Sequence, residues 1–259
     1  MKKYIQEFRV IENTRFSNDT ALIKLTPTEG QLPHMVPGQF VNILISNCDG
    51  VFLRRPISIC DVDYTAGVLT LYVKNIGKGT QTLCQSQPGD QYNILLPLGN
   101  GFIEGSVQLP KKSLLIGGGV GMAPLLYLAR YLKQHDSTVT VLLGGNSSMD
   151  FPLAESFERV GKVCFTTVDG SKGFKGFVTD HPLLKNEEFD IIYCCGPTPM
   201  MKAVAKLAEA QGVRCLASLE NNMACGLGAC LCCVENTIEG HKCVCSDGPV
   251  FDVTELKWS

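Results

Sequence analysis

The chain has 259 residues, of which 45% are apolar and 19% are charged, and its formal net charge is −2. This length and composition are those of a globular enzyme with two compact domains and room for a small third one. The near-neutral charge provides no basic field for nucleic acid or anionic lipid, and the apolar runs are too short to cross a bilayer. Since no apolar signal-peptide segment follows the N-terminus, we expect a cytoplasmic protein without nucleic-acid or membrane partners.

The N-terminal part of the chain has the pattern of a β-structure. Segments rich in β-branched and aliphatic residues occur at 20–25, 40–45 and 68–73, and glycine-containing turns separate them. A helical stretch at 79–85 interrupts the series, and a last strand ends at 97–99. Short strands at this spacing predict an antiparallel β-barrel.

Two groups of residues in this barrel are candidates for binding a flavin. The segment Arg54-Arg55-Pro56-Ile57-Ser58 contains Arg-x-x-Ser, which can place a guanidinium on a pyrophosphate and a hydroxyl beside the flavin N5. Tyr72-Val73-Lys74 and the Gly79-Thr80 start of the helix follow, and the first N–H groups of that helix can bind the same pyrophosphate. The alternative for the two arginines is a pair of solvated surface cations.

After residue 111 strands and helices alternate. Strands are predicted at 113–116, 138–143, 163–168 and 189–195, and helices at 123–134 and 199–211. The first strand is a continuous apolar run, as in a strand buried on both faces. This alternation predicts a parallel sheet covered by helices.

Two turns of the predicted sheet have the form of a dinucleotide site. The segment from Gly119 through Gly121 to Pro124 reads G-x-G-x-x-P between a strand and a helix, and proline suits the first helical turn. Cys195-Gly196-Pro197 also joins a strand to a helix, and two such turns at the carboxyl ends of parallel strands form a ligand crevice. No Lys or Arg at 144–148 can pair with a 2′-phosphate, which favours NAD over NADP unless a cation comes from elsewhere.

The cysteines give the most specific signal. Seven of the 13 lie between positions 215 and 245. Cys225, Cys230 and Cys233 have the C-x4-C-x2-C spacing of plant-type ferredoxins, and Cys245 follows as the fourth ligand of a [2Fe–2S] cluster. Glycines at 226 and 228 let this loop curl and turn its N–H groups toward sulfur.

Zinc is the competing interpretation of the same cysteines, because zinc also takes four thiolates, usually from two short C-x2–4-C knuckles. Cys232 and Cys243 are surplus to the four cluster ligands. Cys243 could replace Cys245, so the fourth ligand is the least constrained by spacing.

In this order, the three sites resemble the ferredoxin–NADP reductase superfamily with an appended iron–sulfur domain. Within it, the chain is most similar to the family of electron-transfer subunits of NAD-dependent dihydroorotate dehydrogenase B. The segments that carry the resemblance are 55–58, 79–80, 117–124, 169–171, 194–197, 218–220, 223–230 and 244–251. The sequence departs from the wider pattern at Ile57, where the superfamily has an aromatic residue, and at Cys232, where such loops usually have glycine.

The fold we expect is α+β multidomain: an antiparallel FAD-binding β-barrel at 1–103, an NAD-binding α/β parallel-sheet domain at 111–214 and a small [2Fe–2S] domain at 215–259. The resemblance implies the contacts of each cofactor. Those of FAD are Arg55, Pro56, Ile57, Ser58 near the flavin N5, Tyr72, Val73, Lys74, Gly79 and Thr80. Those of NAD are Gly119, Gly121, Pro124, Asp169, Cys195 near the nicotinamide, Gly196 and Pro197. The cluster ligands are Cys225, Cys230, Cys233 and Cys245.

The resemblance also implies a function. Electrons would pass from an FMN-containing dihydroorotate dehydrogenase catalytic subunit through the cluster and FAD to NAD⁺, in pyrimidine (UMP) biosynthesis. Two copies of each subunit would form a heterotetramer. The chain is too short to add a barrel of about 250 residues, so we expect it not to oxidise dihydroorotate alone. The alternatives are a hydrogenase, sulfite reductase or ferredoxin–NADP reductase subunit, and a zinc-binding redox sensor or binding module.

Overall fold

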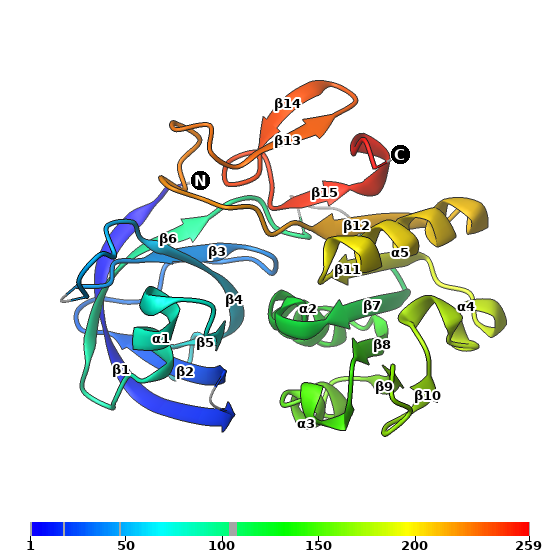
Figure 1. Cartoon of the computed structure of the whole chain (residues 1–259), viewed down its shortest axis with the longest axis horizontal. Coiled ribbons are helices and arrows are strands. Elements are labelled where there is room, and N and C mark those ends of the chain that lie inside the picture. Colours follow the sequence, from blue (N-terminus) through cyan, green and yellow to red (C-terminus); the bar gives the residue numbers. More distant parts are fainter. Residues whose placement is uncertain (1, 18, 47, 104–107, 259) are drawn as a thin grey trace.

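The computed structural model describes residues 2–17, 19–46, 48–103 and 108–258. A closed antiparallel barrel and a seven-stranded sheet lie side by side, and the C-terminal segment lies across the top of both (Figure 1). The barrel, the parallel sheet and the C-terminal unit predicted from the sequence are thereby confirmed. In the described residues, no helix combines the length and the apolar character that a membrane crossing requires.

Six strands form the barrel in the order β1-β2-β5-β4-β3-β6. They are β1 Tyr4–Ser17, β2 Thr20–Pro27, β3 Phe40–Ile43, β4 Arg55–Asp63, β5 Val68–Lys74 and β6 Gln91–Leu98. Burial alternates along β2, where Ala21, Ile23 and Leu25 fill the barrel interior. The helix α1 (Lys78–Cys84) follows β5, close to the helical stretch expected at 79–85.

The second sheet has the order β10-β9-β8-β7-β11-β12-β15. Its strands are β7 Lys112–Gly118, β8 Thr138–Gly145, β9 Lys162–Thr167, β10 Phe174–Lys175, β11 Ile191–Cys195, β12 Arg214–Ser218 and β15 Val250–Asp252. Its helices are α2 Met122–Gln134, α3 Ala154–Glu158, α4 Leu183–Asn186 and α5 Thr198–Gln211. Short 3₁₀ turns are Gly119–Gly121, Ser148–Asp150, Val178–Asp180 and Val253–Glu255. Every pairing is parallel except that of β15 with β12.

The C-terminal segment shares an apolar core with the barrel and the sheet. It contains a hairpin of β13 (Val234–Thr237) and β14 (Gly240–Cys243), and then β15 extends the sheet. Val244 and Phe251 belong to one apolar cluster with Phe40 and Leu98 of the barrel and with residues of β11 and β12. The β15 pairing was not predicted, and β12 crosses the domain boundary that we placed at 214/215, so the exact boundaries stay a proposal.

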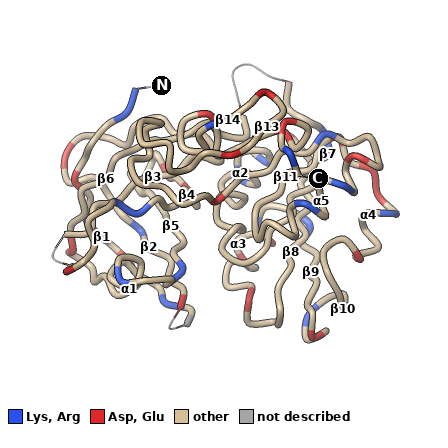
Figure 2. The backbone as a smooth tube through the Cα atoms, turned by 45° about the horizontal axis from the view of Figure 1, so that its top comes forward, with Lys and Arg blue, Asp and Glu red and all other residues tan. Residues whose placement is uncertain are grey.

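Charged residues of both signs are interspersed along both halves of the described backbone, in keeping with the small net charge (Figure 2). Of the ion pairs found among the described residues, one joins the barrel to the sheet. Arg130 of α2 pairs with Asp61 of β4, and burial raises the pKa of the Asp61 carboxyl although Arg130 opposes that shift. Beside it, the Tyr127 hydroxyl of α2 donates to the carbonyl oxygen of Met35 at 3.0 Å. Helix α2 therefore holds the barrel against the sheet through polar as well as apolar contacts.

We predict that Tyr127→Phe lowers the free energy of unfolding by about 1 kcal/mol, because it removes one buried hydrogen bond while keeping the ring. The Met35 carbonyl still accepts a bond from Tyr64, which limits the loss. Urea unfolding monitored by circular dichroism measures the effect. Tyr131→Phe on the same helix is the control, since no hydrogen bond of its hydroxyl is found among the described residues. Equal stability of both variants and the unsubstituted protein would contradict the prediction.

Candidate functional site

The start of β4 and the start of α1 meet through Arg55. A Cβ at Gly79 would lie 2.5 Å from Arg55 Nε, so the arginine side chain crosses directly over this glycine. Any larger residue at position 79 would displace the guanidinium from the first turn of α1. The structure thus brings together the two groups predicted to bind one pyrophosphate.

The two neighbouring arginines have different environments. Arg54 donates from Nη1 to the carbonyl oxygens of Asn42 and Asn93, at 3.3 and 2.9 Å, so it ties barrel strands together. Among the described residues, Nη1 of Arg55 bonds only to nearby carbonyls of its own loop, those of Leu53 and Arg54, at 3.0 and 3.3 Å. Arg54 is therefore a structural residue, and Arg55 is the guanidinium that lies over α1.

The remaining predicted flavin contacts differ in what they can offer. The Thr80 hydroxyl accepts bonds from the N–H groups of Ile76 and Gly77, at 2.9 and 3.1 Å, so this side chain caps the helix. Val73 is fully buried in the barrel core. Thr80 and Val73 can each contribute backbone N–H or C=O groups to a ligand. Half-buried residues of β4, which pair with β3, have side chains within reach of a ligand; these are Pro56, Ile57 and Ser58.

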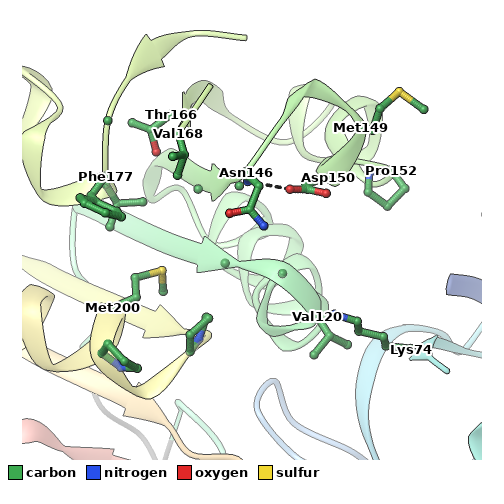
Figure 3. Close-up of a pocket in the computed structure, with 18 of the residues that line it drawn as sticks. Lys74, Val120, Asn146, Met149, Asp150, Pro152, Thr166, Val168, Phe177 and Met200 are labelled. Atoms are coloured by element: carbon green, nitrogen blue, oxygen red, sulfur yellow. Dashed lines mark hydrogen bonds between the residues drawn. The ribbon is translucent and has the colours of Figure 1, made fainter. Parts of the chain in front are cut away.

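A cavity of about 680 Å³ opens between the barrel and the sheet. Tyr72 and Lys74 line it from the barrel side, and Gly119 and Pro197 line it from the two predicted turns of the sheet. Lys74 lies beside Val120 of the first of these turns (Figure 3). These turns touch each other, because a Cβ at Gly121 would lie 2.5 Å from the Cys195 carbonyl carbon. Turns from two neighbouring strands therefore form one crevice, as predicted.

Two of the seven predicted NAD contacts, Gly119 and Pro197, line the cavity. The other five lie behind or beside its lining; these are Gly121, Pro124, Asp169, Cys195 and Gly196. Pro124 is buried within α2, and Cys195 is buried at the end of β11, where burial raises the pKa of its thiol. Asp169 orders its own loop, since its Oδ1 accepts bonds from the N–H and the hydroxyl of Ser171, at 2.9 and 2.6 Å. Its neighbour Val168 lines the cavity instead.

Asp150 is a cavity residue that the sequence interpretation missed. Its Oδ2 accepts bonds from the N–H groups of Asn146 and Ser147, at 2.6 and 3.2 Å, directly after β8 (Figure 3). A carboxylate thus occupies N–H groups that could otherwise bind a phosphate. Among the described residues that line the cavity, Lys74 is the one Lys or Arg, and it stands on the barrel side. The signal in the sequence was the Ser147-x-x-Asp150 pattern after a strand.

Glu220 was also missed as a functional candidate. It follows β12, and its side chain is open to solvent on one side while protein encloses it on the others. This enclosure raises the pKa of its carboxyl, and Lys74 opposes the shift. The negative charge of Glu220 also raises the pKa of the Cys195 thiol, after the larger effect of burial.

The four predicted cluster ligands form two pairs of thiols. Cys225 contacts Cys230, and Cys233 contacts Cys245. Backbone N–H groups point at these sulfurs: Leu227 N lies 3.3 Å from Cys225 Sγ, and Gly228 N lies 3.1 Å from Cys245 Sγ. Burial raises the pKa of Cys225, but N–H donors outweigh it and lower that pKa to about 6. Two thiols per iron with N–H donors to sulfur fit a [2Fe–2S] cluster.

The same geometry bears on zinc and on the surplus cysteines. The described residues contain no group of three Cys, His, Asp or Glu side chains that converges on a single metal ion, as a zinc site requires. Cys232 is exposed. Cys243 also contacts Cys233, but it is Cys245 whose sulfur accepts the Gly228 N–H. This bond supports Cys245 as the fourth ligand.

Comparison with known proteins gives three matching family models. An oxidoreductase FAD-binding domain matches residues 7–102, an oxidoreductase NAD-binding domain matches 115–206, and the iron–sulfur cluster binding domain of dihydroorotate dehydrogenase B matches 220–257. The dihydroorotate dehydrogenase B (NAD(+)) electron transfer subunit of Shouchella clausii is 37% identical over 262 residues, which cover 99% of each chain. The chain belongs to the family of dihydroorotate dehydrogenase B electron transfer subunits.

Other relatives agree with this membership. The electron transfer subunit of Listeria monocytogenes is 40% identical over 97% of this chain and 98% of its own. Among solved structures, NADH-dependent reduced ferredoxin-NADP oxidoreductase, studied for flavin-based electron bifurcation, is 30% identical with a TM-score of 0.82, over 96% of this chain and 89% of that one. The predictions of FAD, NAD and an iron–sulfur cluster are confirmed by the family models, and the zinc interpretation is wrong.

We predict that alanine at Cys225, Cys230, Cys233 or Cys245 abolishes the visible absorption of the cluster, because each of these cysteines supplies one of its four thiolates. Cys232→Ala and Cys243→Ala are the matched controls and keep the absorption. Iron and acid-labile sulfide analysis, with about two of each per chain in the unsubstituted protein, quantifies the result. A colourless Cys243→Ala with a coloured Cys245→Ala would move the fourth ligand to Cys243.

We also predict that NADH reduces the bound FAD much faster than NADPH. Asp150→Ser should lower the ratio of the NADH rate to the NADPH rate by about tenfold. The substitution removes a negative charge and frees two N–H groups near the position expected for the 2′-phosphate of NADPH. Stopped-flow reduction with each nucleotide gives the ratio. Asp190→Ser is the control, since its Oδ2 likewise accepts bonds from two backbone N–H groups, those of Lys111 and Lys112, and it does not line the cavity. A preference unchanged in Asp150→Ser would show that the adenosine end lies elsewhere.

Proposed function

We propose that this chain carries electrons from an FMN-containing dihydroorotate dehydrogenase catalytic subunit, through a [2Fe–2S] cluster and FAD, to NAD⁺ in pyrimidine (UMP) biosynthesis. Supporting this is the contiguity of the three sites: the nucleotide crevice and the cysteine loop both contact the barrel. Tyr72 and Lys74 line the crevice from β5, and Asn42 of β3 bonds to the Cys225 carbonyl. The flavin strand β4 lies between them, paired with both β3 and β5.

The residues of the chain then have distinct tasks. When bound, FAD exchanges a hydride with a nicotinamide and single electrons with a cluster. Arg55 and the first turn of α1 neutralise and hold its pyrophosphate. The Gly119–Gly121 turn admits the dinucleotide close to the backbone, and the Cys195 turn closes the other side of the crevice. The four cysteines and the N–H groups of Leu227 and Gly228 hold the cluster.

The cluster loop also provides the surface for a partner. Cys233 and Cys245 are buried, whereas Cys230 is exposed, so one side of the cluster site faces solvent. Leu227 and Leu231 lie beside it, and these residues are 45% and 64% exposed. We propose that this apolar rim docks on the catalytic subunit, in a heterotetramer of two chains of each kind.

A second candidate follows from the similarity to NADH-dependent reduced ferredoxin-NADP oxidoreductase, which covers almost the whole chain. In that case the partner is a ferredoxin-linked subunit rather than a dihydroorotate dehydrogenase. Both candidates use the same FAD, crevice and cluster, and they differ in what delivers electrons to the cluster.

We predict that the chain alone does not oxidise dihydroorotate, and that NAD⁺-linked orotate formation appears when the FMN-containing catalytic subunit is added. Leu227→Glu should weaken assembly by at least about tenfold, because a charge replaces an apolar contact at the interface. It should leave NADH reduction of ferricyanide nearly intact. Ile238→Glu, at an exposed apolar position in the hairpin, is the control.

Gel filtration and the two activities measured together distinguish the outcomes. Orotate formation that stays absent with the partner, together with NADH-linked reduction of a ferredoxin, would favour the second candidate. Loss of both activities in Leu227→Glu would show that this residue holds the cluster loop rather than the partner.

A further inference from the structure

The barrel grips the cluster loops through two asparagines. Asn42 lies on β3, and Asn100 follows β6, the strand paired with β3. Asn42 Nδ2 donates to the Cys225 carbonyl at 3.3 Å, and Asn100 Nδ2 donates to the carbonyls of Ser246 and Asp247 at 3.3 and 3.0 Å. Each asparagine therefore holds a loop that carries one member of a different thiol pair.

Asn42 has the more unusual environment of the two. Its side chain is fully buried, and its Oδ1 has no hydrogen-bond partner among the described residues. The orientation of the amide follows from its neighbour, because the Cys225 carbonyl is an acceptor and only Nδ2 can donate to it. Burying an amide group with one unpaired atom lowers the stability of the fold. Packing alone therefore does not explain an asparagine at this position of the barrel strand.

The cysteine loop is shaped to meet this amide. Gly226 has a φ of +71°, and a Cβ on it would lie 2.7 Å from Asn42 Nδ2. A side chain at position 226 would therefore both strain the backbone and push the loop off the barrel. Asn42 is also the register partner of Pro56 in the flavin strand. A continuous connection thus runs from the Cys225 backbone through the Asn42 amide to β4.

We propose that Asn42 is a positioning residue that fixes the distance between the cluster and the flavin, and so sets the rate of electron transfer between them. This inference rests on the proposed ligation of the cluster by Cys225. Asn100 supports the same placement from the second loop. The Arg55 strand and the Cys225 loop are held at one spacing because β3 contacts both.

The test compares Asn42→Leu with Asn13→Leu in the full chain with its cofactors. Asn13 is a matched control, since it is a half-buried barrel asparagine whose Nδ2 donates to the carbonyls of Cys84 and Ser86 and whose Oδ1 is likewise unpaired. Among the described residues, Asn13 makes no hydrogen bond to the cluster loop. Anaerobic stopped-flow separates reduction of FAD by NADH from the subsequent reduction of the cluster. We expect Asn42→Leu to leave the first step unchanged and to slow the second several-fold, because a loop released from the barrel no longer holds the cluster at a fixed distance from the flavin.

A second measurement on the same variants does not depend on catalytic turnover. Hydrogen–deuterium exchange of residues 224–229 and the rate of iron release to a chelator should both rise in Asn42→Leu and stay at the unsubstituted values in Asn13→Leu. Gly226→Ala should loosen the same contact from the side of the loop. The double variant Asn42→Leu/Gly226→Ala should reduce the cluster no more slowly than the slower of the two single variants, because both substitutions remove one contact. If Asn42→Leu does not fold, Gly226→Ala alone decides.

Unchanged cluster reduction and unchanged exchange in these variants would overturn the proposal, as would an equal slowing of both electron-transfer steps. Absence of iron from the unsubstituted protein would instead overturn the cluster assignment itself, so the two failures are distinguishable.

Discussion

The contact between the turn at Cys225 and the barrel strand β3 determines how the three parts of the chain can work together. The cysteine-rich segment has too few apolar residues to fold alone, and it takes its core from Phe40 and Leu98 of the barrel and from the sheet. The strand that receives it also pairs with the flavin strand β4. One short barrel strand of four residues therefore contacts the cysteine loop through the Asn42 side chain and also pairs with β4.

Patterns that depend on neighbouring residues were predictable from the sequence. The β-branched and aliphatic segment of β2, the apolar run of β7 and the cysteine spacing are each local, and each gave the correct type of element or the correct ligand class. Helix α5 ends at Gln211 and is followed by Gly212. The φ of Gly212 is +66°, the left-handed conformation that a glycine directly after a helix commonly adopts. The flavin and nicotinamide contacts themselves stay predictions, because their test needs the bound cofactors.

Contacts between distant segments could not be predicted in the same way. Asn42 and Cys225 are separated by 183 positions, and the pairing of β15 with β12 depends on how the hairpin returns the chain to the sheet. Two adjacent arginines gave one signal in the sequence, yet Arg54 bonds to barrel carbonyls and Arg55 crosses Gly79. Asp150 was missed because a carboxylate after a strand acquires meaning only when the N–H groups that it binds are known.

The antiparallel strand β15 has a consequence for how nucleotides enter and leave. Because β15 is attached to the sheet while the loop before it is bonded to Asn100 at the end of the barrel, the C-terminal segment acts as a strap across the two halves. A motion of the barrel against the sheet would therefore strain either the β12 ladder or the loop that carries Cys245. The loops at the rim of the cavity that carry Met149 and Phe177 lie outside this strap, and these two residues are 83% and 68% exposed, so the rim can move without disturbing it.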